Sequence, residues 1–295
     1  MPPMDEVEWA IIVHGGAKTI LSDEAAAHRN GCTKAAAAGA EVLRRGGSAI
    51  DAARVALRML EDDPVFNAGH GSVTNAAGEV EMDAGIMNGT TLAVGAVAAV
   101  QRVVHPVEAA AAMLDAAPVL LVGEGAEAFA LDRGVAQWDD GQVPRLSAGA
   151  GCDTVGCVAM DQNGGFAAAA STGGLDGTVP GRVGDSPMPG CGFYADDAVG
   201  AVALSGEGEA IARTTLGSRV MRAMETRPAE EAVQSIFKPL QRLDAEAGVV
   251  AIDSAGRIGV AHNTDHFALA CASSKFPDVR SAIHQNELKA QELDD

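Results

Sequence analysis

The hydrophobic pattern near the start of the chain predicts one buried strand followed by two helices. Residues 9–17 form an apolar run with a glycine pair near its end, which is typical of a central strand that closely approaches other backbone. His14 in this run is interpreted as a structural histidine. Alanine-rich sequence then predicts a helix over 22–43, capped by Ser22. A second helix is expected over 48–60, where the first residues resemble a capping box.

The pattern changes repeatedly in the middle of the chain. Residues 72–83 alternate around turn formers and predict a hairpin, and residues 93–100 are apolar enough for a buried strand. Segments 106–117 and 124–133 are bounded by proline and glycine and predict helices. Residues 134–151 lose all periodicity, so we expect an exposed connector there.

Two later segments, 158–172 and 250–264, share one pattern: an apolar strand, an Asp-x-x-Gly turn and a second apolar strand. Helices are expected between them over 208–225 and 229–243. Because strands come in pairs and do not alternate with helices, we predict an α+β fold in which sheets pack together and helices lie outside. Residues 281–295 are charged, and a surface helix or a frayed tail is expected.

Composition limits the core and the partners. The 295 residues are 47% hydrophobic but only 3% aromatic, so Ala, Val, Leu, Ile and Met must fill the core. A formal charge of −19 disfavours a nucleic-acid or anionic-membrane surface and leaves a small molecule as the expected partner. No apolar run is long enough for a transmembrane segment. The five widely spaced cysteines do not resemble a disulfide framework or a zinc site, and with no visible signal peptide we expect a cytoplasmic protein.

Thr154 is the first candidate for chemistry, because it lies where the connector meets the apolar strand 155–160. If the bond between Asp153 and Thr154 is cut, the threonine hydroxyl becomes a nucleophile. Its new α-amine, which titrates near pH ~8, becomes the base. The alternative is a β-branched residue that simply favours strands.

Three glycine-rich segments after Thr154 carry further polar groups. Thr172 ends a strand before two glycines, where its hydroxyl can support a nucleophile, although a plain turn would look alike. Arg182 and Asp185 lie in a rigid loop and together fit the α-carboxylate and α-amine of an amino acid. The alternative for this pair is a surface ion pair with each other.

The third segment, residues 204–209, leads into a predicted helix. A hydroxyl from Ser205 and the amide of Gly206 at a helix start are suited to hold an oxyanion. The alternative is an ordinary helix N-cap.

In this order, these features resemble the plant-type asparaginase/isoaspartyl peptidase branch of the N-terminal-nucleophile hydrolases. The resemblance runs from about residue 9 to residue 270. The matching stretches are residues 13–17, 60–64, 66–72, 79–84, 153–156, 171–174, 181–187 and 192–196.

The resemblance implies a single domain over 1–295 that cuts itself between Asp153 and Thr154. The products would be an α chain, 1–153, and a β chain, 154–295, which stay together in a four-layer αββα sandwich and form a homodimer of αβ units. The implied activity is release of L-aspartate from L-asparagine and from β-aspartyl dipeptides.

The resemblance also assigns roles by position. Thr154 is the nucleophile and its α-amine the base, supported by Thr172. Arg182 and Asp185 hold the substrate's α-carboxylate and α-amine. The remaining assignments are the oxyanion hole from Ser205 and Gly206, Gly208 beside the substrate amine, and Asn67 near the nucleophile. No cofactor is expected for the chemistry, but a structural sodium ion is. Its ligands would be the backbone carbonyls of Leu60, Glu61, Asp63, Phe66, Ala68 and His70.

Three departures from the family pattern bear on these expectations. Ser205 stands where the family usually has threonine, so it lacks the methyl group that fixes the rotamer. The connector is shorter than in many relatives, and Asp153 replaces the common glycine, as in the glycosylasparaginase branch. Two alternatives therefore stay open: a glycosylasparaginase-like hydrolase, and an uncleaved module that binds amino acids.

Overall fold

The computed structural model describes residues 8–138, 154–284 and 287, and in these residues the strands form two sheets. The larger has the order β12-β11-β1-β5-β6-β2-β3-β4, and the smaller β10-β9-β8-β7. The strands are β1 (Ala10–Lys18), β2 (Met82–Asn88), β3 (Val94–Val100), β4 (Leu120–Val122), β5 (Thr154–Met160), β6 (Phe166–Thr172), β7 (Phe193–Asp196), β8 (Gly200–Gly206), β9 (Ala247–Asp253), β10 (Ile258–His262), β11 (His266–Ser273) and β12 (Arg280–Ala282). The helices are α1 (Ala25–Arg44), α2 (Ala49–Glu61), α3 (Pro106–Ala111), α4 (Gly123–Asp132), α5 (Gly208–Thr214), α6 (Leu216–Met224), α7 (Ala229–Ala232) and α8 (Phe237–Leu243), with 3₁₀ turns η1 (Gly69–Gly71) and η2 (Val233–Ile236).

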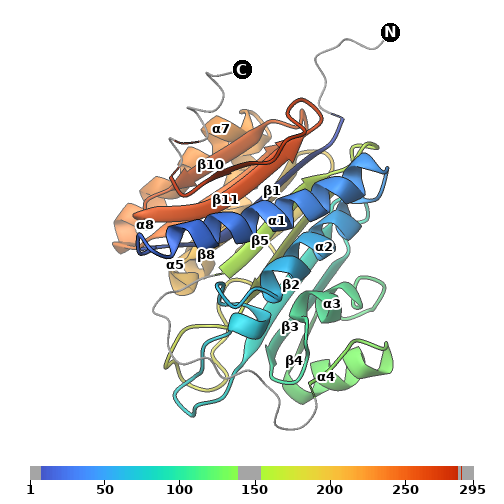
Figure 1. Cartoon of the computed structure of the whole chain (residues 1–295), viewed down its shortest axis with the longest axis vertical. Coiled ribbons are helices and arrows are strands. Elements are labelled where there is room, and N and C mark those ends of the chain that lie inside the picture. Colours follow the sequence, from blue (N-terminus) through green and yellow to red (C-terminus); the bar gives the residue numbers. More distant parts are fainter. Residues whose placement is uncertain (1–7, 139–153, 285–286, 288–295) are drawn as a thin grey trace.

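Alternate residues along each central strand belong to different apolar cores. In β5, Val155 packs toward the helices of the larger sheet, whereas Val158 packs between the two sheets. In β8, Ala203 faces the space between the sheets and Leu204 faces the helices of the smaller sheet. Because successive strand side chains point to opposite faces, each sheet has one face on its helices and one on the other sheet. In Figure 1, α1 and α2 run across one face of the larger sheet. The predicted mixed fold of packed sheets is confirmed.

Large aromatic rings are scarce, and three buried phenylalanines each pack directly against a glycine, one in the core under the helices of the larger sheet and two between the sheets. A Cβ added at these glycines would come within 2.3–2.9 Å of a ring atom, so a side chain there would displace the ring. The pairs are Phe66 with Gly15, Phe193 with Gly85, and Phe267 with Gly248. Glycines thus let the backbone pack closely against the few aromatic rings, so the core is filled although only 3% of the residues are aromatic.

The predicted helices are present, but several boundaries differ. The first begins at Ala25, and no side chain caps it, so the prediction that Ser22 caps it was wrong. The second is capped as expected: Ser48 Oγ accepts the N–H of Asp51 at 3.1 Å. The helix expected over 208–225 is broken at Thr215, which has a left-handed φ of 46°. The helix expected over 229–243 is also divided, into α7, η2 and α8.

The hairpin expected over 72–83 was wrong. Asn75 Oδ1 accepts the N–H groups of Ala77 and Glu79, which folds this segment into a turn, and β2 begins only at Met82. The hairpin formed instead joins β2 to β3. The helix expected over 106–117 ends at Ala111, and the short strand β4 was not foreseen. Most of the connector and of the C-terminal tail lies outside the described residues.

The two similar hairpins predicted over 158–172 and 250–264 are confirmed as β5–β6 and β9–β10. Asp161 and Asp253 occupy the same place in them. The Oδ1 atom of each accepts the N–H groups of the residues two and four positions further on. The Oδ2 atoms accept the N–H of Ala49 at 3.0 Å and of Ala229 at 2.9 Å, the first residues of α2 and α7. Each aspartate therefore fixes a turn and the start of a helix together.

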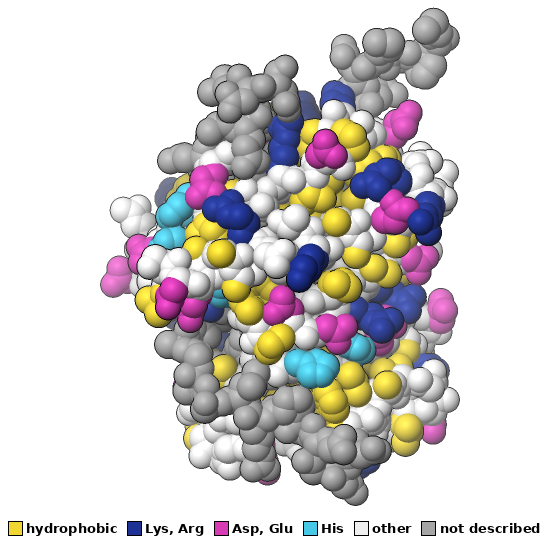
Figure 2. Space-filling model, in the orientation of Figure 1, with side chains coloured by type: hydrophobic (Ala, Val, Ile, Leu, Met, Phe, Trp, Pro, Cys, Tyr) yellow, Lys and Arg dark blue, Asp and Glu magenta, His cyan; other side chains and the backbone are white. Residues whose placement is uncertain are grey.

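Charged groups of both signs are interspersed with hydrophobic ones on the face shown in Figure 2. In the part of the chain that is described, no helix is both long enough and apolar enough to cross a membrane.

We predict that Asp161→Ala lowers the free energy of unfolding by about 2–4 kcal/mol, because two turn N–H groups and the start of α2 lose their acceptor. Asp161→Asn keeps an acceptor for the turn but not for Ala49, so about 1 kcal/mol should be lost. Urea unfolding measures both. Asp132→Ala, an exposed position on α4, is the control and should change stability by less than about 0.5 kcal/mol. Equal losses of stability for the two Asp161 variants would contradict the separate contributions of the turn and of the start of α2.

Candidate active site

Thr154 is the first residue of β5 and lies directly opposite Thr172 of β6. Both side chains are buried and belong to the strand positions that face the other sheet. The Thr154 hydroxyl lies 3.1 Å from the hydroxyl of Ser186, and the Thr154 N–H donates to Ser205 Oγ at 3.4 Å. The proposed nucleophile is therefore surrounded by hydroxyl groups at one end of the space between the sheets.

A cavity of about 130 Å³ opens onto Thr154. It brings together most of the side chains and glycines that the sequence singled out, from β5, β6, the loop before β7, and the start of α5. Its lining residues are Thr154, Thr172, Gly174, Leu175, Arg182, Asp185, Ser186, Gly206, Glu207, Gly208 and Glu209. Asn67 and Ser205 lie next to this cavity and not in its lining, and Asp153 lies outside the described residues.

Asp185 and Arg182 both line the cavity, and they do not pair with each other. Asp185 is 3% exposed, and burial raises the pKa of its carboxyl to about 7, although Arg182 nearby acts in the opposite direction. Among the described residues, nothing hydrogen-bonds Asp185 Oδ2. Arg182 binds Glu209 in a fork of two 2.8 Å bonds, from Nε and Nη2. Its ion pair is therefore with Glu209, and the pair with Asp185 that was considered from the sequence does not form.

Gly208 leaves a space between the charged groups of Asp185 and Arg182. A Cβ added there would lie 2.8 Å from Asp185 Oδ1 and 2.9 Å from Arg182 Nη2. Contacts that short are essentially never made by real side chains, so any other residue at 208 would push the two charged groups aside. A glycine here leaves room for a ligand group between the carboxylate and the guanidinium.

Ser205 lies next to Thr154. It is fully buried, and its hydroxyl accepts the N–H of Ala17 at 3.0 Å as well as that of Thr154. It is not the N-cap of α5, because that position is occupied by Glu207 and has no side-chain cap bond. Gly206 lines the cavity with a φ of 143°, and a Cβ there would meet Glu246 O at 2.4 Å. Position 206 therefore requires glycine.

Asn67 holds the turn that follows Thr172. Its Nδ2 donates to Gly174 O at 2.8 Å, its Oδ1 accepts the N–H of Val73 at 3.0 Å, and its backbone O accepts the N–H of Gly173 at 2.8 Å. The side chain is 5% exposed and does not line the cavity. In this structure Asn67 positions the turn that directly follows Thr172.

Two groups in the site were missed by the sequence reasoning. Ser186 directly follows Asp185 in the glycine-rich loop, and this adjacency was the signal that could have drawn attention to it. Glu209 occupies the Arg182 fork, and its side chain is 62% exposed. Nothing in the sequence indicated that Arg182 would select this carboxylate from the many acidic residues of the chain.

Main-chain oxygens at the end of α2 and in the loop after it lie close to two glycines of that loop. A Cβ at Gly69 would meet Glu61 O at 2.5 Å, and one at Gly71 would meet Phe66 O at 1.9 Å and Pro64 O at 2.9 Å. Among the described residues, no group of three or more His, Cys, Asp or Glu side chains could hold a metal ion. A cation in this loop would therefore be held by carbonyl oxygens, which suit a hard ion.

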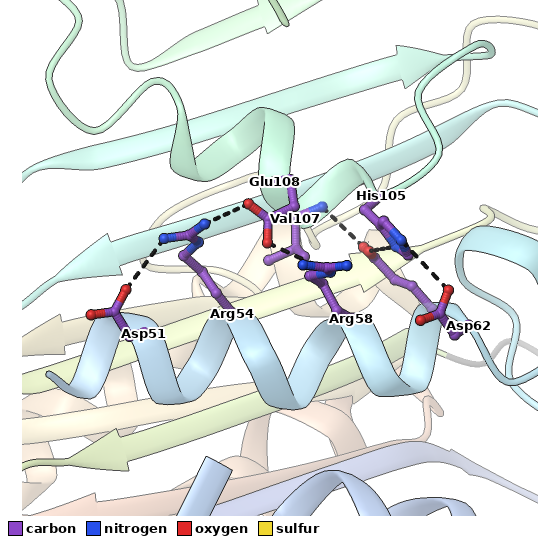
Figure 3. A network of polar contacts seen from close by, with 8 residues as sticks. Asp51, Arg54, Arg58, Asp62, His105, Val107 and Glu108 are labelled. Carbon is purple, nitrogen blue, oxygen red and sulfur yellow. Dashed lines mark hydrogen bonds and ion pairs between the residues drawn. The ribbon is translucent and has the colours of Figure 1, made fainter. Parts of the chain in front are cut away.

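The Glu61 side chain ties the same loop to the strand of Thr172. It is fully buried, so burial raises the pKa of its carboxyl, and Oε1 accepts Ser171 Oγ at 2.6 Å and the N–H of Val107 at 2.9 Å. His105 Nδ1 lies 3.3 Å from Oε2. Figure 3 shows this end of α2, with His105 reaching toward Asp62.

His14 of β1 lies against β5, with its ring packed on Gly156, where an added Cβ would meet Nε2 at 2.2 Å. In the described structure, neither ring nitrogen has a hydrogen-bond partner, and burial lowers the pKa of His14 to about 3 despite the nearby Thr154 backbone. His14 is therefore neutral and structural, as the sequence suggested.

We predict that His14→Phe makes stability less sensitive to acid. In the wild type only the unfolded state takes up this proton between about pH 6.5 and pH 3, so His14 reduces stability by about 1.4 kcal/mol per pH unit as the pH falls through that window. From pH 6.5 to pH 5, urea unfolding should show about 2 kcal/mol less loss in the variant than in the wild type. Between pH 7.5 and pH 8.5 the two should change in parallel, and parallel behaviour at pH 5 as well would contradict the prediction.

Comparison with known proteins extends over nearly the whole chain. A family model described as asparaginase matches residues 7–145 and 138–279. An isoaspartyl peptidase/L-asparaginase of Danio rerio is 40% identical over 268 residues, which cover 83% of this chain and 86% of the relative. The protein of that name from Homo sapiens is 38% identical, covering 83% and 87%. An isoaspartyl peptidase of Salmonella typhimurium is 36% identical over 288 residues, covering 86% and 92%. This chain therefore belongs to the asparaginase family.

Proposed function

We propose that this protein is an amidohydrolase that releases L-aspartate from L-asparagine and from β-aspartyl dipeptides, with Thr154 as the nucleophile. The observation that carries the proposal is the cavity in which the Thr154 hydroxyl shares one small space with the opposite charges of Arg182 and Asp185. The relatives named isoaspartyl peptidase/L-asparaginase support this choice of substrates.

Substrate binding would use the two charges separately. Arg182 receives the α-carboxylate in its fork, and the ionised Asp185 receives the α-ammonium through Oδ1, the oxygen beside Gly208. Gly208 leaves the space between them. Glu209 must first release Arg182, and because its side chain is 62% exposed, an exchange of one carboxylate for another costs little.

The reaction would then proceed at the side-chain carbonyl of the substrate. The Thr154 hydroxyl attacks this carbon and passes its proton to the free α-amine of the same residue. The oxyanion is held at Gly206 and Ser205, and Thr172 and Ser186 orient the hydroxyl of Thr154. The protonated amine gives its proton to the departing ammonia or amino acid. Water then cleaves the resulting ester and releases L-aspartate.

Formation of the free amine requires self-cleavage before Thr154, into chains 1–153 and 154–295 of one domain. The Thr154 nitrogen already lies in the site, hydrogen-bonded to Ser205. Three apolar cores support the four-layer αββα sandwich of the N-terminal-nucleophile hydrolases. The first lies between the larger sheet and its helices, the second between the two sheets, and the third between the smaller sheet and its helices.

A structural sodium ion in the loop after α2 is also part of the proposal. Its ligands would be the backbone carbonyls of Leu60, Glu61, Asp63, Phe66, Ala68 and His70, which lie at the end of α2 and in the loop that follows it. The ion would hold the loop that carries Asn67, which in turn holds the turn after Thr172.

The remaining expectations rest on the family and on composition. We propose a homodimer of αβ units that acts on small molecules in the cytoplasm. The acidic charge of −19 supports a role that involves neither nucleic acid nor an anionic membrane surface.

We predict that Thr154→Ala remains a single 29.9 kDa chain on a denaturing gel and has no activity on L-asparagine, because both the hydroxyl for self-cleavage and the nucleophile are lost. Thr154→Ser keeps the hydroxyl and should still be cut. If Thr154→Ala is cut as well, Thr154 is not the nucleophile.

The same gel separates the alternatives. A wild-type chain that stays intact and binds L-aspartate without turnover would be an amino-acid-binding module. Preferential turnover of glycosylated asparagine would identify a glycosylasparaginase-like hydrolase.

We predict that the preference for L-aspartate over L-malate as an inhibitor falls about fourfold between pH 8 and pH 6.5. Asp185, with its pKa raised to about 7, loses its charge over this range and no longer attracts the ammonium, which L-malate lacks. Inhibition constants for the two ligands measure the ratio, so groups that affect both ligands equally cancel. In Asp185→Asn the ratio should be low at every pH, and a pH-independent ratio in the wild type would contradict the assignment of Asp185.

A further inference from the structure

A second hollow, of about 450 Å³, lies on α6 and the segments that follow it. Helix α6 buries Leu216, Val220 and Met221 in the core beside the smaller sheet, so its other side faces outward. We call this hollow the basic pocket, and its lining residues are Thr215, Ser218, Arg219, Arg222, Ala223, Thr226, Arg227 and Ser235. It shares no residue with the cavity at Thr154.

The basic pocket combines three guanidinium groups with four hydroxyl groups, and no carboxylate lines it. Arg219 and Arg222 lie one helical turn apart on the exposed side of α6, and Arg227 precedes α7. In the described part of the chain, none of the three forms an ion pair. The protein as a whole is acidic, with a formal charge of −19, so a cluster of three arginines differs in sign from its net charge.

Arg219 is held in a fixed orientation. Its Nε donates to Thr214 O at 2.8 Å, and this carbonyl is presented where Thr215, in a left-handed conformation, ends α5. With Nε used, the two terminal amino groups of the guanidinium stay available for an oxygen-rich ligand. Ser235 Oγ, at the other side of the basic pocket, is buried and has no hydrogen-bond partner among the described residues.

The hollow beside α2 offers a direct comparison. Its volume is about 400 Å³, and Arg54, Arg58 and Arg133 line it, but so does Glu108. Figure 3 shows Arg54 between Asp51 and Glu108, with 2.7 Å to the latter, and Arg58 beside the same carboxylate. Two of those arginines are thus paired with carboxylates, whereas no Asp or Glu is among the described residues that line the basic pocket.

We propose that the basic pocket binds a phosphate-type oxyanion, either free or carried by a small metabolite. Guanidinium forks and the hydroxyls of Thr226 and Ser235 match the oxygens of a phosphate group, and the Nε bond of Arg219 leaves both of its terminal amino groups for one. A volume of about 450 Å³ is in the range of small-molecule sites. The ligand would not compete with an amino acid for Arg182.

Isothermal titration of the full protein at low salt tests the proposal, with inorganic pyrophosphate and adenosine 5′-monophosphate as probes. We expect one site per chain and affinity that falls as salt is added. Arg222→Gln and Arg219→Gln should each weaken binding by about tenfold. Tighter binding of pyrophosphate would indicate a free oxyanion, and tighter binding of the nucleotide would indicate a phosphorylated metabolite.

The matched control is Arg242→Gln, which removes the same charge from an exposed position on α8 outside the basic pocket and should leave binding unchanged. The Arg222→Gln variant should also keep the wild-type kcat/KM for L-asparagine. The proposal is overturned if neither probe binds, if Arg242→Gln weakens binding as much as Arg222→Gln, or if Arg182→Gln abolishes binding, because the last result would place the ligand at Thr154.

Discussion

The antiparallel pairing of β5 with β6 is the constraint on which the rest of the site depends. This register sets Thr154 opposite Thr172 and turns both into the space between the sheets. If either strand slipped by one residue against the other, its threonine would turn toward the helices, because strand side chains alternate. Asp161 fixes the register by accepting the turn N–H groups between the two strands. The alternation also turns Ser171 the other way, onto the buried Glu61, so one strand serves both the cavity and the loop after α2.

The electrostatics of the cavity are set by one guanidinium group, that of Arg182, which is surrounded by several carboxyl groups. Arg182 is bound by Glu209 and lies near Asp185 and Asp83, and burial raises the pKa of Asp83 to about 6. An excess of carboxylates around one guanidinium favours an arriving ammonium, while an arriving carboxylate must displace one already present. A zwitterion does both, because it brings a partner for Asp185 as it takes the place of Glu209. The two charges of an amino acid thus suit this cavity better than a simple anion does.

Much of this site could be predicted from residue types and spacing. The cavity brings together Thr154, Arg182 and Asp185, which the sequence singled out, although residue types alone left another role open for each and their order along the chain carried the assignment. The strand–turn–strand repeats were visible as paired apolar runs. The rest depended on tertiary contacts. Whether Arg182 pairs with Asp185 or with Glu209 depends on how α5, which carries Glu209, packs against the loop of Arg182. The helix break at Thr215 depends on a positive φ, which threonine usually avoids. The turn at Asn75 was mistaken for strand because a side-chain acceptor replaced a backbone partner.

The strand order of the larger sheet has a consequence for a chain cut before Thr154. In β1-β5-β6-β2, the first hairpin of the second fragment is inserted between two strands of the first fragment, and β11 of the second fragment pairs with the far edge of β1. Asp161 adds a bond from the second fragment to the start of α2 in the first. Scission would therefore leave interleaved polypeptides that cannot part without dismantling the sheet, so the new terminus would stay where the fold put it and dilution alone would not dissociate the pair.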